Sequence, residues 1–251
     1  MNIKMNLFQK IGQYLILMGR VFSKPERWSI YRKRIVVEME SLGVNSIGIV
    51  AIISVFIGAV LTLQMSLNLD NAFIPPYLIG YATRESLVLE FSSTIVALIL
   101  AGKVGSNIAS EIGTMIITEQ VDALEIMGIN SASYLMLPKI VAAMLFFPFL
   151  TILSIGIGVV GAYMIITFNP SIMSMDDFLT GLRFDFEPLY IWYSLIKTVI
   201  FAFIITSISG YYGYYTKGNS LEVGRASTKA VVSSCITVLI FNLLITQLML
   251  T

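Results

Sequence analysis

The stretch Glu111-Ile-Gly-Thr-Met-Ile-Ile-Thr-Glu-Gln-Val-Asp-Ala-Leu-Glu-Ile-Met-Gly128 decides how this chain is organised, because it is a polar, acid-rich run between two hydrophobic segments. Wound at 3.6 residues per turn, residues 113–128 form an amphipathic helix. One face carries Ile117, Val121 and Leu124, and the opposite face carries Glu119, Asp122 and Glu125. A loop between two membrane spans has no need of this pattern. It therefore indicates either a docking helix for a soluble partner or a short surface helix that caps two spans.

The composition describes an integral membrane protein. Hydrophobic residues make up 57% of the 251, charged residues only 12%, and the mean hydropathy is +0.84, whereas about a quarter of a soluble domain is charged. The net charge of +1 argues against a nucleic-acid partner. The chain has no histidine, which removes the usual general base and the commonest metal ligand. Its one cysteine, Cys235, lies in an apolar run and forms no internal disulfide. We expect no metal site, no cofactor and no catalytic residue.

Five segments are long enough to cross a bilayer, which takes about 20 apolar residues. They are residues 44–67, 87–108, 140–168, 189–215 and 231–250. Glu90 and Lys103 interrupt the second segment, and Pro148 is expected to kink the third. With no repeat or linker in the sequence, we expect one domain. The predicted fold is an all-α integral membrane protein with five transmembrane helices.

Basic residues predict the orientation. Eight of the 16 precede the first span, namely Lys4, Lys10, Arg20, Lys24, Arg27, Arg32, Lys33 and Arg34. By the positive-inside rule the N-terminus is cytoplasmic, five crossings place Thr251 outside, and the acidic helix faces the cytoplasm. Residues 1–42 are expected to form interfacial and elbow helices. Their apolar stripe, which is Leu7, Ile11, Tyr14, Met18 and Phe22, fits a helix lying in the headgroup plane.

Ionisable residues inside a bilayer are costly, at roughly 2.5–3.5 kcal/mol each, and call for an explanation. Glu90, Arg84 and Lys197 either form a polar cluster around an outward-facing cavity for a charged headgroup, or Lys197 snorkels to the interface while Glu90 pairs locally. Ser154, Gly158 and Ala162 repeat every four residues in the third span and predict close helix packing. No nucleotide-binding motif is present. Uphill transport therefore needs a partner or an ion gradient.

The run Ala101-Gly-Lys-Val-Gly105, followed by Glu111-Ile-Gly-Thr-Met and Thr118-Glu-Gln-Val-Asp-Ala-Leu124, closely resembles the MlaE (YrbE) permease family from about Arg32 onward. Members are membrane subunits of bacterial phospholipid-trafficking ABC transporters that work with MCE-domain proteins. The resemblance implies a homodimer in the inner membrane, with a cytoplasmic ATPase dimer docked on the coupling helix. It also implies a periplasmic MCE-protein ring above a lipid pocket, and a role in outer-membrane lipid asymmetry. The C-terminus would be periplasmic.

The same resemblance assigns residues. The coupling signature is carried by Glu111, Gly113, Thr114, Thr118, Glu119, Gln120, Asp122 and Leu124. Glu90 matches a glutamate that commonly follows an arginine at the lipid cavity, but Leu89 stands where that arginine is usual. Arg84 or Lys197 is expected to supply the missing basic contact. Two other functions stay open from the residues alone: an ion-coupled secondary carrier with Glu90 as its proton site, and an intramembrane lipid-modifying enzyme.

Overall fold

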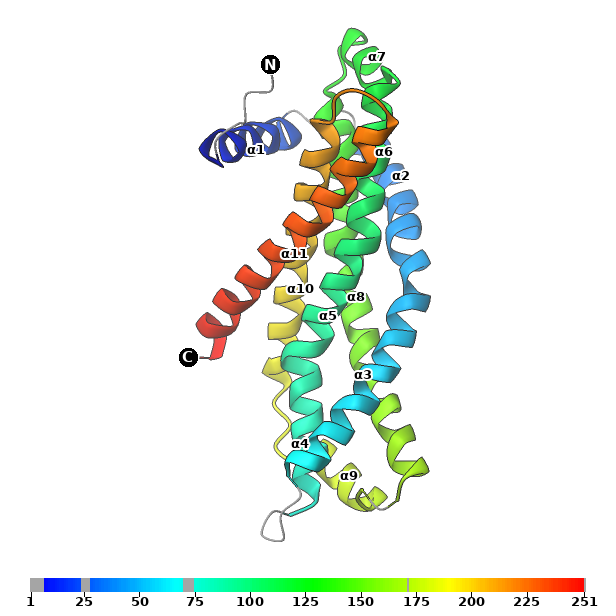
Figure 1. Cartoon of the computed structure of the whole chain (residues 1–251), viewed down its shortest axis with the longest axis vertical. Coiled ribbons are helices and arrows are strands. Elements are labelled where there is room, and N and C mark those ends of the chain that lie inside the picture. The colour runs from blue at the N-terminus through cyan, green and yellow to red at the C-terminus, as the bar shows by residue number, and fades with distance from the viewer. Residues whose placement is uncertain (1–6, 24–27, 70–74, 171, 251) are drawn as a thin grey trace.

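The computed structural model describes residues 7–23, 28–69, 75–170 and 172–250, and Figure 1 shows a bundle of long helices. The elements in chain order are α1 (Leu7–Phe22), α2 (Trp28–Glu38), η1 (Met39–Gly43), η2 (Val44–Ser46), α3 (Ile47–Asn68), α4 (Tyr77–Ser86), η3 (Leu87–Phe91), α5 (Ser92–Leu100), η4 (Ala101–Gly105), α6 (Ser106–Ile117), α7 (Gln120–Ile126), α8 (Ser131–Phe168), α9 (Met175–Arg183), α10 (Pro188–Tyr214) and α11 (Ser220–Leu250). Every element in the described residues is helical, so the predicted all-α class is confirmed.

Five helical runs are long and apolar enough to cross a membrane. Within the described ranges they are Tyr31–Asn68, Tyr77–Ile117, Ser131–Phe168, Pro188–Tyr214 and Ser220–Met249. Four of these runs are longer than the apolar segments of the sequence, whereas Pro188–Tyr214 nearly matches its segment. The predicted count of five spans is confirmed.

Two of the runs contain π-helical turns. In the first run η1, followed by the short 3₁₀ turn η2, joins α2 to α3, and in the second η3 and η4 flank α5. A π-turn places an extra residue in the helical turn and often marks a functional position. Here η3 carries Glu90 and η4 carries Lys103, the two ionisable residues that interrupt the second apolar segment.

The small residues of α8 pack directly on α3, as the four-residue repeat predicted. The hydroxyl of Ser54 donates to that of Ser154 at 2.8 Å. A Cβ on Gly58 would overlap the carbonyl of Gly158, so at this crossing only glycine permits the backbones to come so close. Ala162, the third member of the repeat, is fully buried.

Several short elements gather at the two ends of the bundle. In Figure 1 α1 lies across the end that holds the α6–α7 hairpin and the α10–α11 loop, while α4 and α9 close the other end. Leu17 and Val21 of α1 are fully buried against the bundle, whereas Phe8 and Leu15 are exposed. Helix α1 thus buries some of its apolar side chains against the bundle and exposes others. The sequence had predicted a single apolar stripe.

Candidate functional site

A polar cluster centred on Glu90 lies where η3 meets α10 and α11. The ammonium of Lys197, from α10, lies 2.7 Å from the Glu90 carboxylate. It also donates to the carbonyl of Leu89 at 3.1 Å and to the hydroxyl of Thr246 at 3.0 Å. The amide of Asn242 donates to Glu90 as well. The cluster thereby joins η3, α10 and α11 through groups that would each be costly to leave unpaired in an apolar medium.

The two charges of this cluster differ in their exposure. The Lys197 side chain is 4% exposed and already has three acceptors, whereas 38% of the Glu90 side chain is exposed. Thr94 completes the cluster, with its hydroxyl 3.4 Å from Glu90 and 3.1 Å from the amide oxygen of Asn242. Glu90 is therefore the member that presents a charged surface outward, and Lys197 fixes its position.

The structure does not bring Arg84 into this cluster. The Arg84 guanidinium pairs with Glu85 at 2.6 Å and donates to the carbonyls of Leu182 and Phe184, each at 2.9 Å, and of Asp185 at 3.1 Å. These carbonyls lie at and just beyond the C-terminal end of α9, where the helix leaves them without partners. Arg84 thus fastens α9 to α4, and among the residues that the structure describes Lys197 alone supplies a basic contact to Glu90.

The predicted helix over 113–128 is broken into two in the structure. Helix α6 continues to Ile117 and a separate short helix, α7, begins at Gln120. Between them Glu119 takes a left-handed conformation with φ of 59°, which turns the chain. No glycine or proline stands at this turn to predict it from the sequence. The helix predicted over 113–128 is therefore replaced by a helical hairpin.

A glycine closes this hairpin on its other side. Gly128 has φ of 78°, and the amide of Ile129 donates to the carbonyl of Leu124 at 3.0 Å, which is the glycine-capped ending common at helix C-termini. Val121 is buried, Leu124 is half-buried, and Ile126 is 87% exposed. The tip presents an apolar side chain beside acidic ones.

Several residues of the coupling signature support the hairpin. Gly113 is buried where a Cβ would press on Thr216 and Val223 at 3.3 Å. Thr114 and Thr118 hydrogen-bond to carbonyls four residues earlier in the chain, at 2.8 Å each. The members exposed at the tip are Glu119, Gln120 and Asp122.

Glu111 belongs to an ion network, centred on the buried Lys139, that the sequence did not reveal. The ammonium of Lys139 lies 2.8 Å from Glu111 and 2.7 Å from Glu38, so this network ties α6, α8 and α2 together. In the chain Lys139 is 28 positions from Glu111 and 101 positions from Glu38. Sequence spacing alone therefore gave no sign of the contact.

Asn242 and Thr246 also escaped the sequence analysis. The available signal was an amide and a hydroxyl one helical turn apart on an otherwise apolar span, a pattern that indicates a polar partner inside the bilayer. No group of three or more acidic, histidine or cysteine side chains in the described part of the chain is placed to hold a metal ion.

Comparison with known proteins adds a family and several relatives. The family model described as permease MlaE matches residues 35–248. The chain is 38% identical over 246 residues to a probable ABC transporter permease protein of Rickettsia bellii, covering 96% of this chain and 93% of that one. A probable ABC transporter permease protein of Synechocystis is 33% identical over 96% of this chain and 91% of its own length. The Arabidopsis thaliana chloroplast protein TRIGALACTOSYLDIACYLGLYCEROL 1 is 29% identical over 92% of this chain and 66% of its own length.

Proposed function

Since the chain belongs to the MlaE permease family and is an ABC transporter permease, we propose that it moves phospholipid between the bacterial inner membrane and a periplasmic MCE-protein carrier. In this role it maintains outer-membrane lipid asymmetry. It works as a homodimer with a cytoplasmic ATPase dimer, and it catalyses no reaction of its own. The Arabidopsis relative is named after a glycerolipid, which supports a lipid as the cargo.

The half-exposed Glu90 beside the buried Lys197 is the observation that carries this proposal. A carboxylate held at a fixed place within an apolar bundle suits the ammonium of a zwitterionic headgroup. The acyl chains would lie along the outer half of α11, which leaves the bundle in Figure 1 and exposes Leu243, Leu244 and Leu248. The same apolar face supports a second copy of the chain as the other wall of a lipid pocket.

The lipid site is tested by reversing the charge that faces the pocket. Glu90→Lys should reduce the phospholipid that co-purifies with the complex and the lipid transferred to the carrier in proteoliposomes. Glu187→Lys makes the same charge change at the exposed N-terminal end of α10, outside the cluster, and should retain both. Unchanged lipid content in Glu90→Lys would remove Glu90 from the pocket.

The orientation follows from the charge distribution along the folded chain. Lys10, Arg20 and Arg32 lie on elements at the end of the bundle that carries the hairpin, whereas the opposite end has Arg84 and Arg183. An excess of basic residues marks the cytoplasmic side. We therefore assign the N-terminus and the hairpin to the cytoplasm, and the C-terminal end of α11 to the periplasmic side.

The α6–α7 hairpin is the proposed contact with the ATPase. Ile126 is 87% exposed and Met127 is 65% exposed, so two apolar side chains at the tip have no partner in the described chain. Ile126→Asp should leave the protein inserted and folded but abolish co-purification of the ATPase. Leu221→Asp introduces the same change at a 62% exposed position at the start of α11 and should keep the ATPase. Normal co-purification from Ile126→Asp would refute the docking role.

A further inference from the structure

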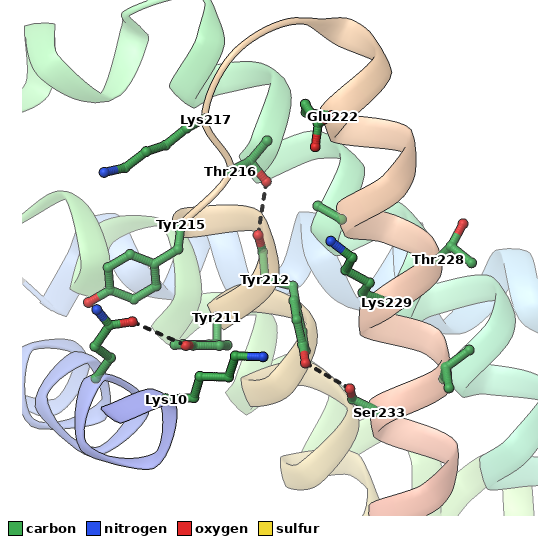
Figure 2. Close-up of a pocket in the computed structure, with 13 residues that line it drawn as sticks. Lys10, Tyr211, Tyr212, Tyr215, Thr216, Lys217, Glu222, Thr228, Lys229 and Ser233 are labelled. Atoms are coloured by element: carbon green, nitrogen blue, oxygen red, sulfur yellow. Dashed lines mark hydrogen bonds between the residues drawn. The ribbon is translucent and has the colours of Figure 1, made fainter. Parts of the chain in front are cut away.

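A large cleft lies at the hairpin end of the bundle, where α1 crosses the C-terminal end of α10 and the first turns of α11. Its volume is about 910 Å³, which is within the range of small-molecule sites. Figure 2 shows Lys10 from α1 and Lys229 from α11 extending toward Tyr212 from two sides, with Lys217 above Tyr215. Three separate elements thus bring cations and aromatic rings to one hollow.

The charges of this cleft are not neutralised within the described chain. None of Lys10, Lys217 and Lys229 forms an ion pair with a described residue. The one acidic side chain of the lining, Glu222, pairs with Arg225. Three exposed ammonium groups line this hollow and its one carboxylate is paired elsewhere, so the cleft carries a positive charge that would attract an anion.

The aromatic wall is held in place by contacts of its own. The Tyr212 hydroxyl lies 2.9 Å from the hydroxyl of Ser233, and the Tyr211 hydroxyl donates to Gln13 at 3.3 Å. The rings of Tyr211 and Tyr212 pack edge to face with centroids 5.4 Å apart. Tyrosines with an apolar ring and a polar tip are typical of the boundary between headgroups and acyl chains.

We propose that this cleft binds the headgroup of an anionic phospholipid from the leaflet at the hairpin end of the membrane. The phosphate lies between Lys10 and Lys229, and the acyl chains run down the apolar side of α11. That side begins at Val232, which lines the cleft and is 52% exposed, and continues to Ile236, which is 54% exposed. This apolar surface leading out of the cleft favours a lipid, because a soluble phosphate compound has no acyl chain to place on it.

This site is separate from the one at Glu90. It lies at the opposite end of the bundle and is basic, whereas the Glu90 cluster presents a carboxylate. Only the name of the leaflet, cytoplasmic, rests on the proposed orientation. Lipid retention at the cleft is measured without ATP or a carrier, so failure of transport leaves this inference standing, and failure here leaves the transport proposal standing.

The test uses the full chain reconstituted in vesicles of equal phosphatidylglycerol and phosphatidylcholine, followed by native mass spectrometry of the released protein. The wild type should retain phosphatidylglycerol in preference to phosphatidylcholine. Lys10→Glu with Lys229→Glu should lower phosphatidylglycerol retention by on the order of tenfold, since each basic side chain near the surface attracts anionic lipid. Lys10→Arg with Lys229→Arg should restore retention, which separates loss of charge from misfolding.

The matched control makes the same charge change at the same end of the bundle. Arg32 and Lys33 are exposed residues of α2, and reversing both should leave the retained lipid unchanged. Equal retention by the Lys10 and Lys229 double variant would overturn the proposal, as would equal loss in the control. Displacement of the lipid by excess inorganic phosphate would show a soluble-phosphate site instead.

Discussion

Lys139→Met is expected to destabilise the chain strongly, because it removes the cation shared by two carboxylates. The Lys139 side chain is only 2% exposed, that of Glu38 is 11% exposed, and that of Glu111 is 42% exposed. Breaking a buried ion pair by removing one partner costs about 3–5 kcal/mol. Nearly all of this cost falls on Glu38, because water reaches Glu111 and screens it. Glu111→Gln should therefore cost only about 1 kcal/mol or less.

The assay is equilibrium unfolding of the purified full chain in mixed micelles, followed by circular dichroism. Comparing wild type, Lys139→Met, Glu38→Gln and the double variant completes a double-mutant cycle. Glu38→Gln should recover about 2 kcal/mol in the Lys139→Met background, since it removes the orphaned charge. If the double variant is no more stable than Lys139→Met, the reasoning is refuted, and lost packing of the lysine stem explains the effect.

Gly58→Ala should destabilise the α3–α8 crossing by several kcal/mol, because the new Cβ would overlap the backbone of α8. Gly156→Ala should be neutral, because its Cβ would meet nothing within 4 Å. Thermal unfolding of both variants checks this. Asn242→Leu should speed hydrogen exchange in the outer half of α11, which depends on the bond to Glu90, and unchanged exchange would show that α11 is held otherwise. Glu119→Gly should preserve or slightly raise stability, by up to about 1 kcal/mol, because glycine takes the left-handed conformation without strain; a clear fall in the unfolding midpoint would contradict this.

The sequence predicts the spans well because the bilayer imposes a simple length and polarity rule. It predicts less well how far each helix extends. The second apolar segment was placed at 87–108, yet the helical run is Tyr77–Ile117. The added residues include charged ones, and tertiary contacts such as that of Arg84 with the end of α9 meet the cost of placing them there. Such contacts cannot be inferred from local hydropathy.

Long-range pairing explains the remaining differences at the candidate site. The sequence correctly singled out Glu90 and Lys197 as groups needing an explanation, and the structure joins them at 2.7 Å. The sequence analysis placed Arg84 in the same cluster because all three residues lie near the same end of the predicted spans. The break at Glu119 was hidden because residues 113–128 keep helical periodicity on both sides of it. Periodicity reports which face is apolar, and it does not report where the helix bends.

The proposed lipid site at Glu90 and the proposed ATPase contact at the α6–α7 hairpin are connected by one helical run. This connection has a mechanical consequence. Glu90 and Glu111 are 21 residues apart within Tyr77–Ile117, or about 32 Å at 1.5 Å per residue, close to the thickness of the hydrocarbon layer. A displacement of the α6–α7 hairpin is transmitted along this run to the polar cluster if the cytoplasmic part of the run moves with the bundle. The bond from Glu111 to Lys139 provides that attachment, because it joins α6 to α8 just below the hairpin. Lys139→Met should therefore lower the lipid moved per ATP hydrolysed even in folded protein, and an unchanged ratio would show that coupling takes another route.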